Sequence, residues 1–260
     1  MSKLKIENLN KTYDLGKGKT LTALSNINLE VEENEFAILV GPSGCGKSTL
    51  LNIIAGLEEG DEGSSLMLDG GKITGPGADR GMVFQSYTLF PWLSVRKNIA
   101  FGLNLKKGSK EETQRIVDHY MNAVGLSAFA DAYPRNLSGG MKQRVAIART
   151  LANKPKLLLM DEPFGALDAQ TRVVMQEMLS DVWKKEKTTV LFVTHDIDEA
   201  ILMGTKIFVM SRRPGRIKTV LDVNLPGERS HKSMMLPEFL AIKSQIMELI
   251  WEESREAASE

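Results

Sequence analysis

An octapeptide in the first quarter of the chain carries residue types that bind phosphate. Residues 41–48 read Gly-Pro-Ser-Gly-Cys-Gly-Lys-Ser and match the pattern G-x-x-x-x-G-K-[ST] at every fixed position. The glycines let backbone N–H groups turn inward around phosphate oxygens, Lys47 adds a mobile positive charge, and Ser48 offers a hydroxyl to Mg²⁺. An apolar run at 36–40 precedes the loop, and helically spaced apolar residues begin at Leu50. This order of strand, glycine loop and helix predicts a phosphate-binding loop (P-loop) for a nucleoside triphosphate.

Two acidic residues follow another apolar run. Asp161 and Glu162 come directly after residues 157–160, which are all apolar. An acid at the end of a buried strand can hold Mg²⁺ through its coordination shell, and the neighbouring carboxylate can orient the attacking water. Adjacent acids also occur in ordinary solvated turns. In a chain with a P-loop we interpret them as hydrolytic: Asp161 as a metal ligand and Glu162 as the group that polarises water.

A third motif predicts a second anion-binding helix start. Ser138, Gly139 and Gly140 open a predicted helix before Asp161. Serine is a good N-cap, and glycines leave backbone N–H groups accessible to an anion. One nucleotide seldom needs two such helix starts from a single subunit. We therefore expect this motif to face a nucleotide held by another copy of the chain.

The elements that must position these motifs alternate along the sequence. Apolar residues at roughly every second position predict strands within residues 4–32. Continuous apolar runs predict buried strands at 36–40, 157–160, 190–193 and 207–210. A helix is predicted over 170–187, between two of these strands. Strands alternating with helices imply a parallel α/β sheet.

The middle of the chain and its tail have a different pattern. Between 95 and 154 the pattern predicts helices at 110–124 and 142–151 and no convincing strand between them. The tail holds an amphipathic stretch in which Pro237 suits the first helical turn. We expect this tail helix to pack on the core, and the basic segment at 211–217 to be a solvated loop.

Composition excludes several classes of protein. The 260 residues contain 33 Lys and Arg against 33 Asp and Glu, so the balanced charge argues against a nucleic-acid-binding protein. The first residues lack the apolar run of a signal peptide, and no segment is long and apolar enough for a membrane helix. The chain has one cysteine, Cys45, so it forms no internal disulfide. Nearby Lys47 and a helix start are expected to lower the pKa of that thiol, although a small residue that merely fits the loop is the simpler interpretation.

Taken together, the motifs closely resemble ATP-binding cassette (ABC) ATPases. Residues 137–141, Leu-Ser-Gly-Gly-Met, are similar to the family signature LSGGQ, with Met141 in place of Gln. The resemblance runs from about residue 4 to residue 216. It implies one nucleotide-binding domain over 1–260, with a P-loop NTPase α/β core, a mixed and largely parallel sheet, an N-terminal antiparallel β subdomain and an inserted helical subdomain. The implied boundaries are a core at 1–94 and 155–223, a helical insertion at 95–154 and a helical tail at 224–260.

The resemblance also implies roles for single residues that have ordinary interpretations when taken alone. Tyr13 matches the aromatic that stacks on adenine, Gln85 the glutamine that touches Mg²⁺ and water, and His195 the switch histidine. Asp168 matches the acid that crosses a dimer interface. The implied catalytic residues are Glu162, His195, Gln85 and Lys47. The implied ligands of Mg²⁺ are Ser48, Gln85 and Asp161. The implied ATP contacts are Tyr13, Gly41, Pro42, Ser43, Gly44, Cys45, Gly46, Lys47, Ser48, Thr49, Ser138, Gly139, Gly140 and Asp168.

Two segments, 84–99 and 211–217, look like the nitrate/sulfonate/taurine branch of ABC importers. The resemblance implies an ATP-hydrolysing importer subunit, peripheral on the cytoplasmic face of the inner membrane. It closes head to tail with a second copy of itself and drives uptake of a small anion through a separate permease, which a solute-binding protein supplies.

Two questions on partners and function stay open at this stage. The apolar residues between Gln85 and Trp92 are expected to dock the permease, with packing inside the protein as the alternative. A stand-alone or export-linked ABC ATPase is the alternative function. A GTPase is disfavoured because 153–156, Asn-Lys-Pro-Lys, lacks the Asp of a guanine-reading motif. The stretch after residue 210 is too short for a further regulatory barrel or a second cassette.

Overall fold

Two stretches that are distant in sequence form the first of two compact units in this computed structural model. The first unit consists of residues 1–77 and 189–260, and the second of residues 78–188. The structure describes residues 2–106, 108–227 and 229–259. The second unit is wider than the predicted helical insertion because it also holds two strands and a further helix. The domain boundaries at 94, 154 and 223 stay a prediction.

An antiparallel sheet opens the first unit, with strands in the order β2-β1-β4-β5. Leu4, Ile6 and Leu9 of the first strand are all buried. Their spacing changes from two to three because the pairing register shifts between Ile6 and Leu9, where Asn8 has a φ of 51°. The strands are β1 (Ser2–Asp14), β2 (Thr20–Glu32), β4 (Ser65–Leu68) and β5 (Gly71–Lys72).

A second sheet of the first unit holds the strand that leads into the P-loop. That strand, β3, is parallel to β8 and β9, while β10 pairs antiparallel with β9. All five residues of β3 are buried, as expected for a strand covered on both faces. These strands are β3 (Phe36–Val40), β8 (Thr189–Val193), β9 (Lys206–Met210) and β10 (Ile217–Asp222).

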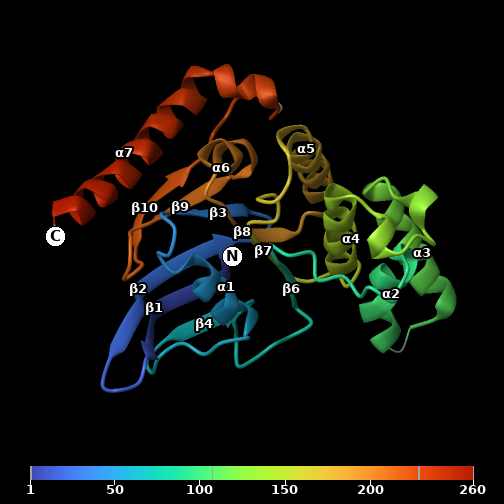
Figure 1. The fold of residues 1–260 in the computed structure, drawn as a ribbon, viewed down its shortest axis with the longest axis horizontal. Helices are drawn as coiled ribbons and strands as arrows, with labels where there is room; N and C mark the ends of the chain where they lie inside the picture. The colour runs from blue at the N-terminus through green and yellow to red at the C-terminus, as the bar shows by residue number, and fades with distance from the viewer. Residues whose placement is uncertain (1, 107, 228, 260) are drawn as a thin grey trace. The chain divides into compact units, whose positions relative to one another are not determined.

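The helices of the first unit cover these strands. Figure 1 shows α6 beside β3, and the tail helix α7 passing α6. Phe239 and Ile246 of α7 are fully buried, which confirms that the tail helix packs on the protein's own core. The helical segments are α1 (Lys47–Ala55), α6 (Ile197–Met203), a 3₁₀ turn η3 (His231–Met235) and α7 (Pro237–Ser259).

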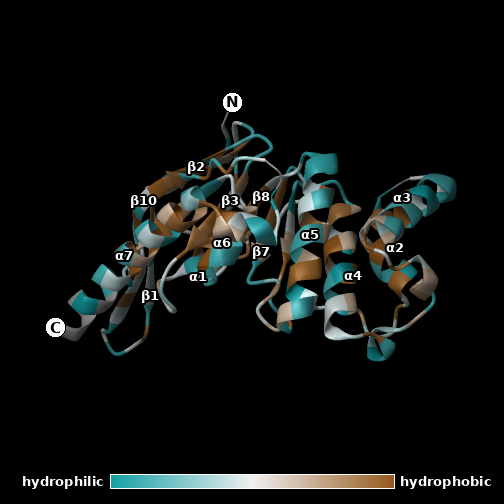
Figure 2. Ribbon diagram, turned by 90° about the horizontal axis from the view of Figure 1, so that it is seen from above, coloured by the Kyte–Doolittle hydropathy of each residue, from teal (hydrophilic) through white to brown (hydrophobic). Residues whose placement is uncertain are grey.

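Among its described residues, the second unit combines one pair of parallel strands with four α-helices. Strands β6 (Arg80–Val83) and β7 (Leu157–Asp161) pair in parallel. Helix α4 contacts β6 and three other helices, which makes it the centre of this unit. Along α4 and α5 apolar and polar segments alternate in Figure 2, as expected for helices packed on one side. The helices are α2 (Val95–Leu105), α3 (Lys110–Ala123), α4 (Gly139–Leu151) and α5 (Ala169–Glu186), with 3₁₀ turns η1 (Ser127–Phe129) and η2 (Pro134–Asn136).

The α/β class predicted from the sequence is confirmed, with a mixed, mostly parallel strand arrangement and an N-terminal antiparallel sheet. The sequence analysis did not predict β4, β5, β6, β10, α2 or α6. Strand β6 contains Arg80 and Gly81 and so has no apolar run, whereas β10 has no fully buried residue. Within the described residues, no helix has the length and apolar character to cross a membrane.

Candidate functional site

The P-loop forms a cradle at the start of helix α1. Gly46, the residue before the helix, has a left-handed φ of 89°, and no side chain caps the first turn. A side chain at this position would also press on the carbonyl oxygen of Ala23. Since the residue before α1 is a glycine, which has no side chain to cap the helix, the first-turn N–H groups are suited to binding an anion.

Lys47 places its positive charge inside this loop. Its Nζ donates to the carbonyl oxygens of Gly41, at 3.0 Å, and Pro42, at 3.3 Å. The side chain is buried, while Ser43 and Ser48 are exposed. A cation held only by backbone carbonyls in these contacts can turn to an arriving phosphate, so the predicted role of Lys47 fits the geometry.

Cys45 differs from the prediction. Its side chain is only 1% exposed. Burial raises the pKa of the Cys45 thiol, and the opposing effect of the Lys47 charge is smaller. The expected lowering of this pKa was therefore wrong, and the interpretation of Cys45 as a small residue that fits the loop agrees with its burial.

His195 lies at the same sheet edge as the P-loop. Leu39 of β3 pairs with Val193 of β8, and the next residue, Thr194, donates its N–H to the carbonyl of Leu39 at 3.2 Å. His195 follows β8 just as Gly41 follows β3. Parallel strands that end together place their following loops side by side, which is where α/β proteins bind ligands.

Tyr13 is tied to helix α1 by its hydroxyl group. The hydroxyl donates to the carboxylate of Glu58 at 3.0 Å and contacts the hydroxyl of Thr49 at 3.5 Å. The ammonium of Lys11 lies over the ring, 5.0 Å from its centroid. Tyr13 of β1 thus lies close to Thr49, which belongs to the helix that begins at the P-loop, and the adenine and phosphate contacts of these two residues stay predictions.

In the second unit the structure brings Gln85 and Glu162 together. Val83 at the end of β6 pairs with Met160 of β7, and each predicted residue follows its strand partner by two positions. A Cβ placed on Gly165 would lie 3.8 Å from the Gln85 Nε2 and 3.7 Å from the Glu162 Oε2. Glu162 has a left-handed φ of 42°, and its carbonyl accepts the N–H of Gly165 at 3.1 Å. The strained turn places the carboxylate beside the Gln85 amide.

Two predicted residues are helix caps. Ser138 accepts the N–H of Met141 at 3.3 Å and caps α4, as predicted. Asp168 accepts the N–H of Thr171 at 2.9 Å and caps α5. Hydrogen bonds from the Thr171 backbone and side chain lower the pKa of Asp168. Asp161, the last residue of β7, lies one position before Glu162.

The glycines of the signature motif are closely packed against neighbouring side chains. A Cβ on Gly139 would lie 2.8 Å from the Tyr87 hydroxyl, and one on Gly140 would lie 2.5 Å from the Thr171 methyl. A cavity of about 330 Å³ opens beside Ser138 and Gly140. The backbone at the start of α4 therefore borders open space, as an anion site requires.

The sequence analysis did not identify two residues that hold the loop carrying Gln85. Arg149 donates to the carbonyl of Thr88 at 2.9 Å and to its hydroxyl at 3.2 Å. Asn98, which is fully buried, accepts the N–H of Phe90 at 2.9 Å and donates to its carbonyl at 3.2 Å. Arg149 lies on α4, 61 positions after Thr88, and Asn98 lies on α2. No local sequence motif indicates that either residue holds this loop.

An aromatic cluster continues this loop. The ring of Phe90 lies 5.7 Å from that of Trp92 and 4.3 Å from that of Phe101, between centroids. Trp92 is 70% exposed and Phe101 38%. Of the two interpretations left open by the sequence, exposure favours a surface available to a partner.

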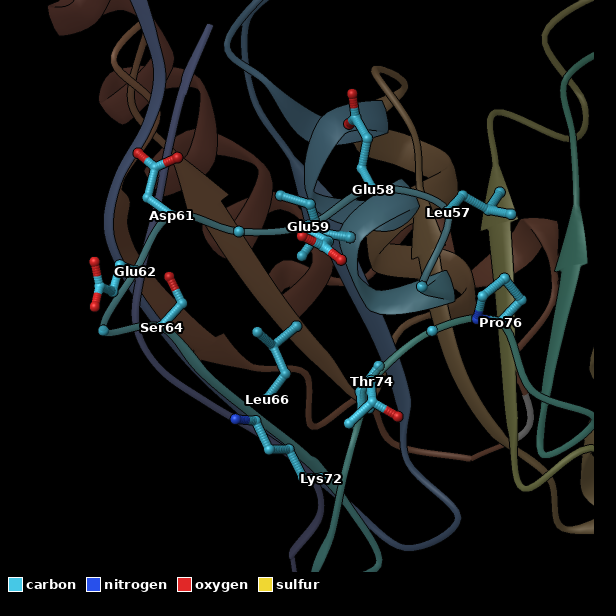
Figure 3. Close-up of a pocket in the computed structure, with 16 residues that line it drawn as sticks. Leu57, Glu58, Glu59, Asp61, Glu62, Ser64, Leu66, Lys72, Thr74 and Pro76 are labelled. Atoms are coloured by element: carbon cyan, nitrogen blue, oxygen red, sulfur yellow. The ribbon is translucent and has the colours of Figure 1, made fainter.

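A larger pocket in the first unit is a different site. Figure 3 shows this cavity of about 610 Å³, with Glu58, Glu59, Asp61 and Glu62 among its lining residues. These four carboxyl groups outnumber the one lysine of the lining, Lys72, so the charge of this pocket disfavours phosphate binding.

The predicted site residues thus form two groups, one within each unit. The first unit holds Tyr13, the P-loop residues 41–49 and His195. The second holds Gln85, Ser138, Gly139, Gly140, Asp161, Glu162 and Asp168. The meeting of both groups around one nucleotide stays a prediction.

Comparison with known proteins identifies the family. Residues 24–165 match the family described as ABC transporter. An uncharacterised ABC transporter ATP-binding protein of Methanocaldococcus jannaschii is 53% identical over 96% of this chain and 92% of its own length. A nitrate import ATP-binding protein of Synechocystis is 49% identical over 95% of this chain and 94% of its own. A taurine import ATP-binding protein of Pelagibacter ubique is 43% identical over 96% of both chains.

Solved structures agree. A dimeric ATP-binding cassette in a post-hydrolysis state, bound to ADP and phosphate, superposes with a TM-score of 0.74. It is 35% identical and is covered over 99% of its length and 85% of this chain. Since its motifs, fold and relatives all agree, this chain belongs to the ATP-binding cassette ATPases of ABC transporters.

Proposed function

We propose that the P-loop of this chain binds the phosphates of ATP and that Glu162 activates the water that attacks them. The observation that carries the proposal is the uncapped start of α1, with Lys47 held only by the carbonyls of Gly41 and Pro42 in the contacts described. Lys47 and His195 stabilise charge on the transferred phosphoryl group, and Gln85 orients the water that Glu162 polarises. Tyr13 stacks on the adenine.

The residues proposed to hold Mg²⁺ fit a hard cation. Ser48 offers an exposed hydroxyl, Gln85 an exposed amide oxygen and Asp161 a carboxylate, all of them oxygen donors. When bound, Mg²⁺ would neutralise charge on the phosphate oxygens.

A second copy of the chain completes the proposed site. Ser138 and Gly140 border a cavity at the start of α4. Support comes from the related cassette that was solved as a dimer with ADP and phosphate. Two copies arranged head to tail would place the P-loop of each against Ser138, Gly139 and Gly140 of the other, and Asp168 beside that interface.

The transport role is inferred from relatives whose names describe import of nitrate and of taurine. We propose that this chain drives uptake of a small anion of the nitrate or sulfonate type. Transport would run through a separate permease, supplied by a solute-binding protein, with the chain on the cytoplasmic face of the membrane. These import relatives favour an importer over a stand-alone or export-linked ATPase.

The hydrolytic proposal is tested with two variants of the full chain. Glu162→Gln is expected to bind ATP, to lose at least about 100-fold in hydrolysis rate, and to accumulate as a closed dimer. Lys47→Ala is expected to lose ATP binding. Phosphate release, nucleotide binding and size-exclusion chromatography are the measurements. Wild-type hydrolysis by Glu162→Gln would remove Glu162 from its proposed role.

The docking proposal is tested with the membrane permease that this chain is proposed to drive. Trp92→Ala is expected to reduce co-purification with that permease and to uncouple transport while ATP binding is kept. Trp251→Ala is the matched control, since Trp251 is 60% exposed on α7, in the other unit. Equal co-purification and transport by both variants would contradict docking at Trp92.

A further inference from the structure

The segment that follows strand β9 packs against the backbone of the P-loop. Gly215 donates its N–H to the carbonyl of Ala23 at 2.9 Å and accepts the N–H of Ser25 at 2.9 Å. Its Cα faces the carbonyl oxygen of Cys45 so closely that no side chain fits between them. At the other end of the P-loop, Gly41 lies against Met210, the last residue of β9. The loop of residues 211–216 therefore touches the P-loop backbone and cannot move without affecting it.

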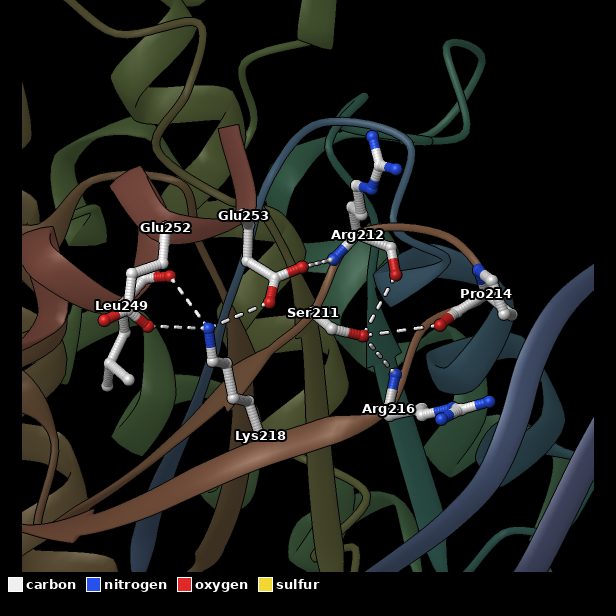
Figure 4. A network of polar contacts seen from close by, with 8 residues as sticks. All are labelled: Ser211, Arg212, Pro214, Arg216, Lys218, Leu249, Glu252 and Glu253. Carbon is white, nitrogen blue, oxygen red and sulfur yellow. Dashed lines mark hydrogen bonds and ion pairs between the residues drawn. The ribbon is translucent and has the colours of Figure 1, made fainter. Parts of the chain in front are cut away.

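This supporting loop is itself tied together by Ser211. The Ser211 hydroxyl accepts the N–H of Arg216 at 3.0 Å and donates within the turn to the carbonyl of Arg212 at 2.9 Å, and the Ser211 N–H donates to the Arg216 carbonyl at 2.9 Å. Figure 4 shows these bonds around the Ser211 hydroxyl. Ser211 and Arg216, the two ends of the loop, are hydrogen-bonded to each other. A displacement of Arg212, next to one end, is therefore expected to displace Gly215, next to the other.

A carboxylate of the tail helix holds the loop. Glu253 of α7 accepts the backbone N–H of Arg212 at 2.8 Å and pairs with the ammonium of Lys218 at 3.0 Å (Figure 4). Its side chain is 9% exposed. Burial raises the pKa of Glu253, but the Arg212 N–H and the Lys218 charge together outweigh burial and leave the pKa below its ordinary value. The carboxylate is thus charged and fully engaged at neutral pH.

The neighbouring acid provides an internal control. Glu252 also pairs with Lys218, at 3.0 Å, but its side chain is 62% exposed. In Figure 4 it lies on the far side of Lys218 from the loop. Removing Glu252 changes the charge of α7 and weakens the Lys218 contact, yet leaves the bond to Arg212 in place.

We propose that Glu253 is a positioning residue for nucleotide binding: by holding Arg212, it keeps the 211–216 loop against the backbone of Cys45 and fixes the shape of the phosphate cradle. The proposal rests on the proposed function of the P-loop and assigns α7 a part in it. When the contact is lost, the loop moves away from Cys45, the P-loop N–H groups converge less well, and affinity for ATP falls.

The test uses the full chain with Glu253→Ala, Glu253→Gln and Glu252→Ala, and two readouts. One is the Kd for Mg·ATP with the KM and kcat of hydrolysis. The other is the rate at which a thiol reagent modifies Cys45, the only cysteine of the sequence, without nucleotide. Glu253→Ala is expected to raise Kd and KM about tenfold, the size of one lost charge-assisted hydrogen bond, with little change in kcat, and to speed Cys45 modification. Glu252→Ala is expected to match the wild type in both.

Glu253→Gln separates the two contacts of the carboxylate. Its amide oxygen still accepts the Arg212 N–H, so it is expected to fall between wild type and Glu253→Ala. If Glu253→Ala does not fold, the comparison of Glu253→Gln with Glu252→Gln replaces it. Unchanged Kd and unchanged Cys45 reactivity, even with a lowered thermal midpoint, would overturn the proposal. A wild-type chain that binds no ATP would instead refute the proposed function, while the Cys45 rate still reports on the loop.

Discussion

The amide of Gln85 and the carboxylate of Glu162 lie on the same side of Gly165, each within 4 Å of the position that a Cβ there would take. The two residues are separated by most of the second unit in sequence, and the paired ends of β6 and β7 bring them together. The space next to both groups is where we propose that the attacking water is oriented.

Replacement of Gly165 tests this gap. A methyl group at this position makes ordinary contacts, so Gly165→Ala is expected to fold normally while it fills the space between amide and carboxylate. We expect kcat to fall about tenfold or more with ATP affinity unchanged, because water loses its place beside Glu162. Gly75→Ala is the control, since a Cβ there meets no atom within 4 Å. Equal kcat values for the two variants would count against the proposed water position.

Arg149 is expected to control the mobility of the loop that carries Gln85. Its guanidinium donates to both the carbonyl and the hydroxyl of Thr88. The single ammonium of a lysine is poorly suited to making both hydrogen bonds at once. Arg149→Lys is therefore expected to speed amide hydrogen exchange across residues 88–93 by about 10-fold or more, the loss of one charge-assisted hydrogen bond. Arg115→Lys on the exposed side of α3 is the control. Equal exchange rates in the two variants would show that Arg149 does not restrain the loop.

Glu253 predicts a pH dependence of stability. Its pKa is lowered in the folded protein, so its stabilising contribution is fully present above the ordinary glutamate pKa of 4.5 and is lost as the pH falls through the lower folded value. The free energy of unfolding should therefore differ most between wild type and Glu253→Gln near neutral pH. The difference should shrink towards about pH 3. Urea unfolding measured at several pH values gives this comparison, and a difference that grows on acidification would contradict it.

The buried side chains of α7 are expected to contribute to the free energy of unfolding, and the exposed ones are not. Ile246 is fully buried, whereas Leu240 on the same helix is 53% exposed. Ile246→Ala is expected to lower the free energy of unfolding by about 2–5 kcal/mol, through lost burial and the cavity left behind. Leu240→Ala is expected to change it by less than about 0.5 kcal/mol. Similar urea midpoints for both variants would mean that α7 does not pack as described.

The sequence by itself determined the motifs that lie in short contiguous segments. The P-loop at 41–48, the acids at 161–162 and the Ser138 cap need only local backbone geometry, and the structure has a strand before or a helix after each motif. The predicted buried strands are present in the structure for a similar reason: a run of four or five consecutive apolar residues is best buried as a strand covered on both faces. Strands β4, β5, β6 and β10, none of which has four consecutive apolar residues, were missed.

Only the tertiary structure decided how residues far apart act on each other. Arg149 holds Thr88 across 61 positions, and Glu253 holds Arg212 across 41. Neither pair has a pattern that sequence spacing could reveal, because a hydrogen bond depends on distance in space. The thiol of Cys45 shows the same principle. Sequence neighbours predict a lowered pKa, but the depth at which the fold buries the thiol decides the sign, because desolvation outweighs the charge of Lys47.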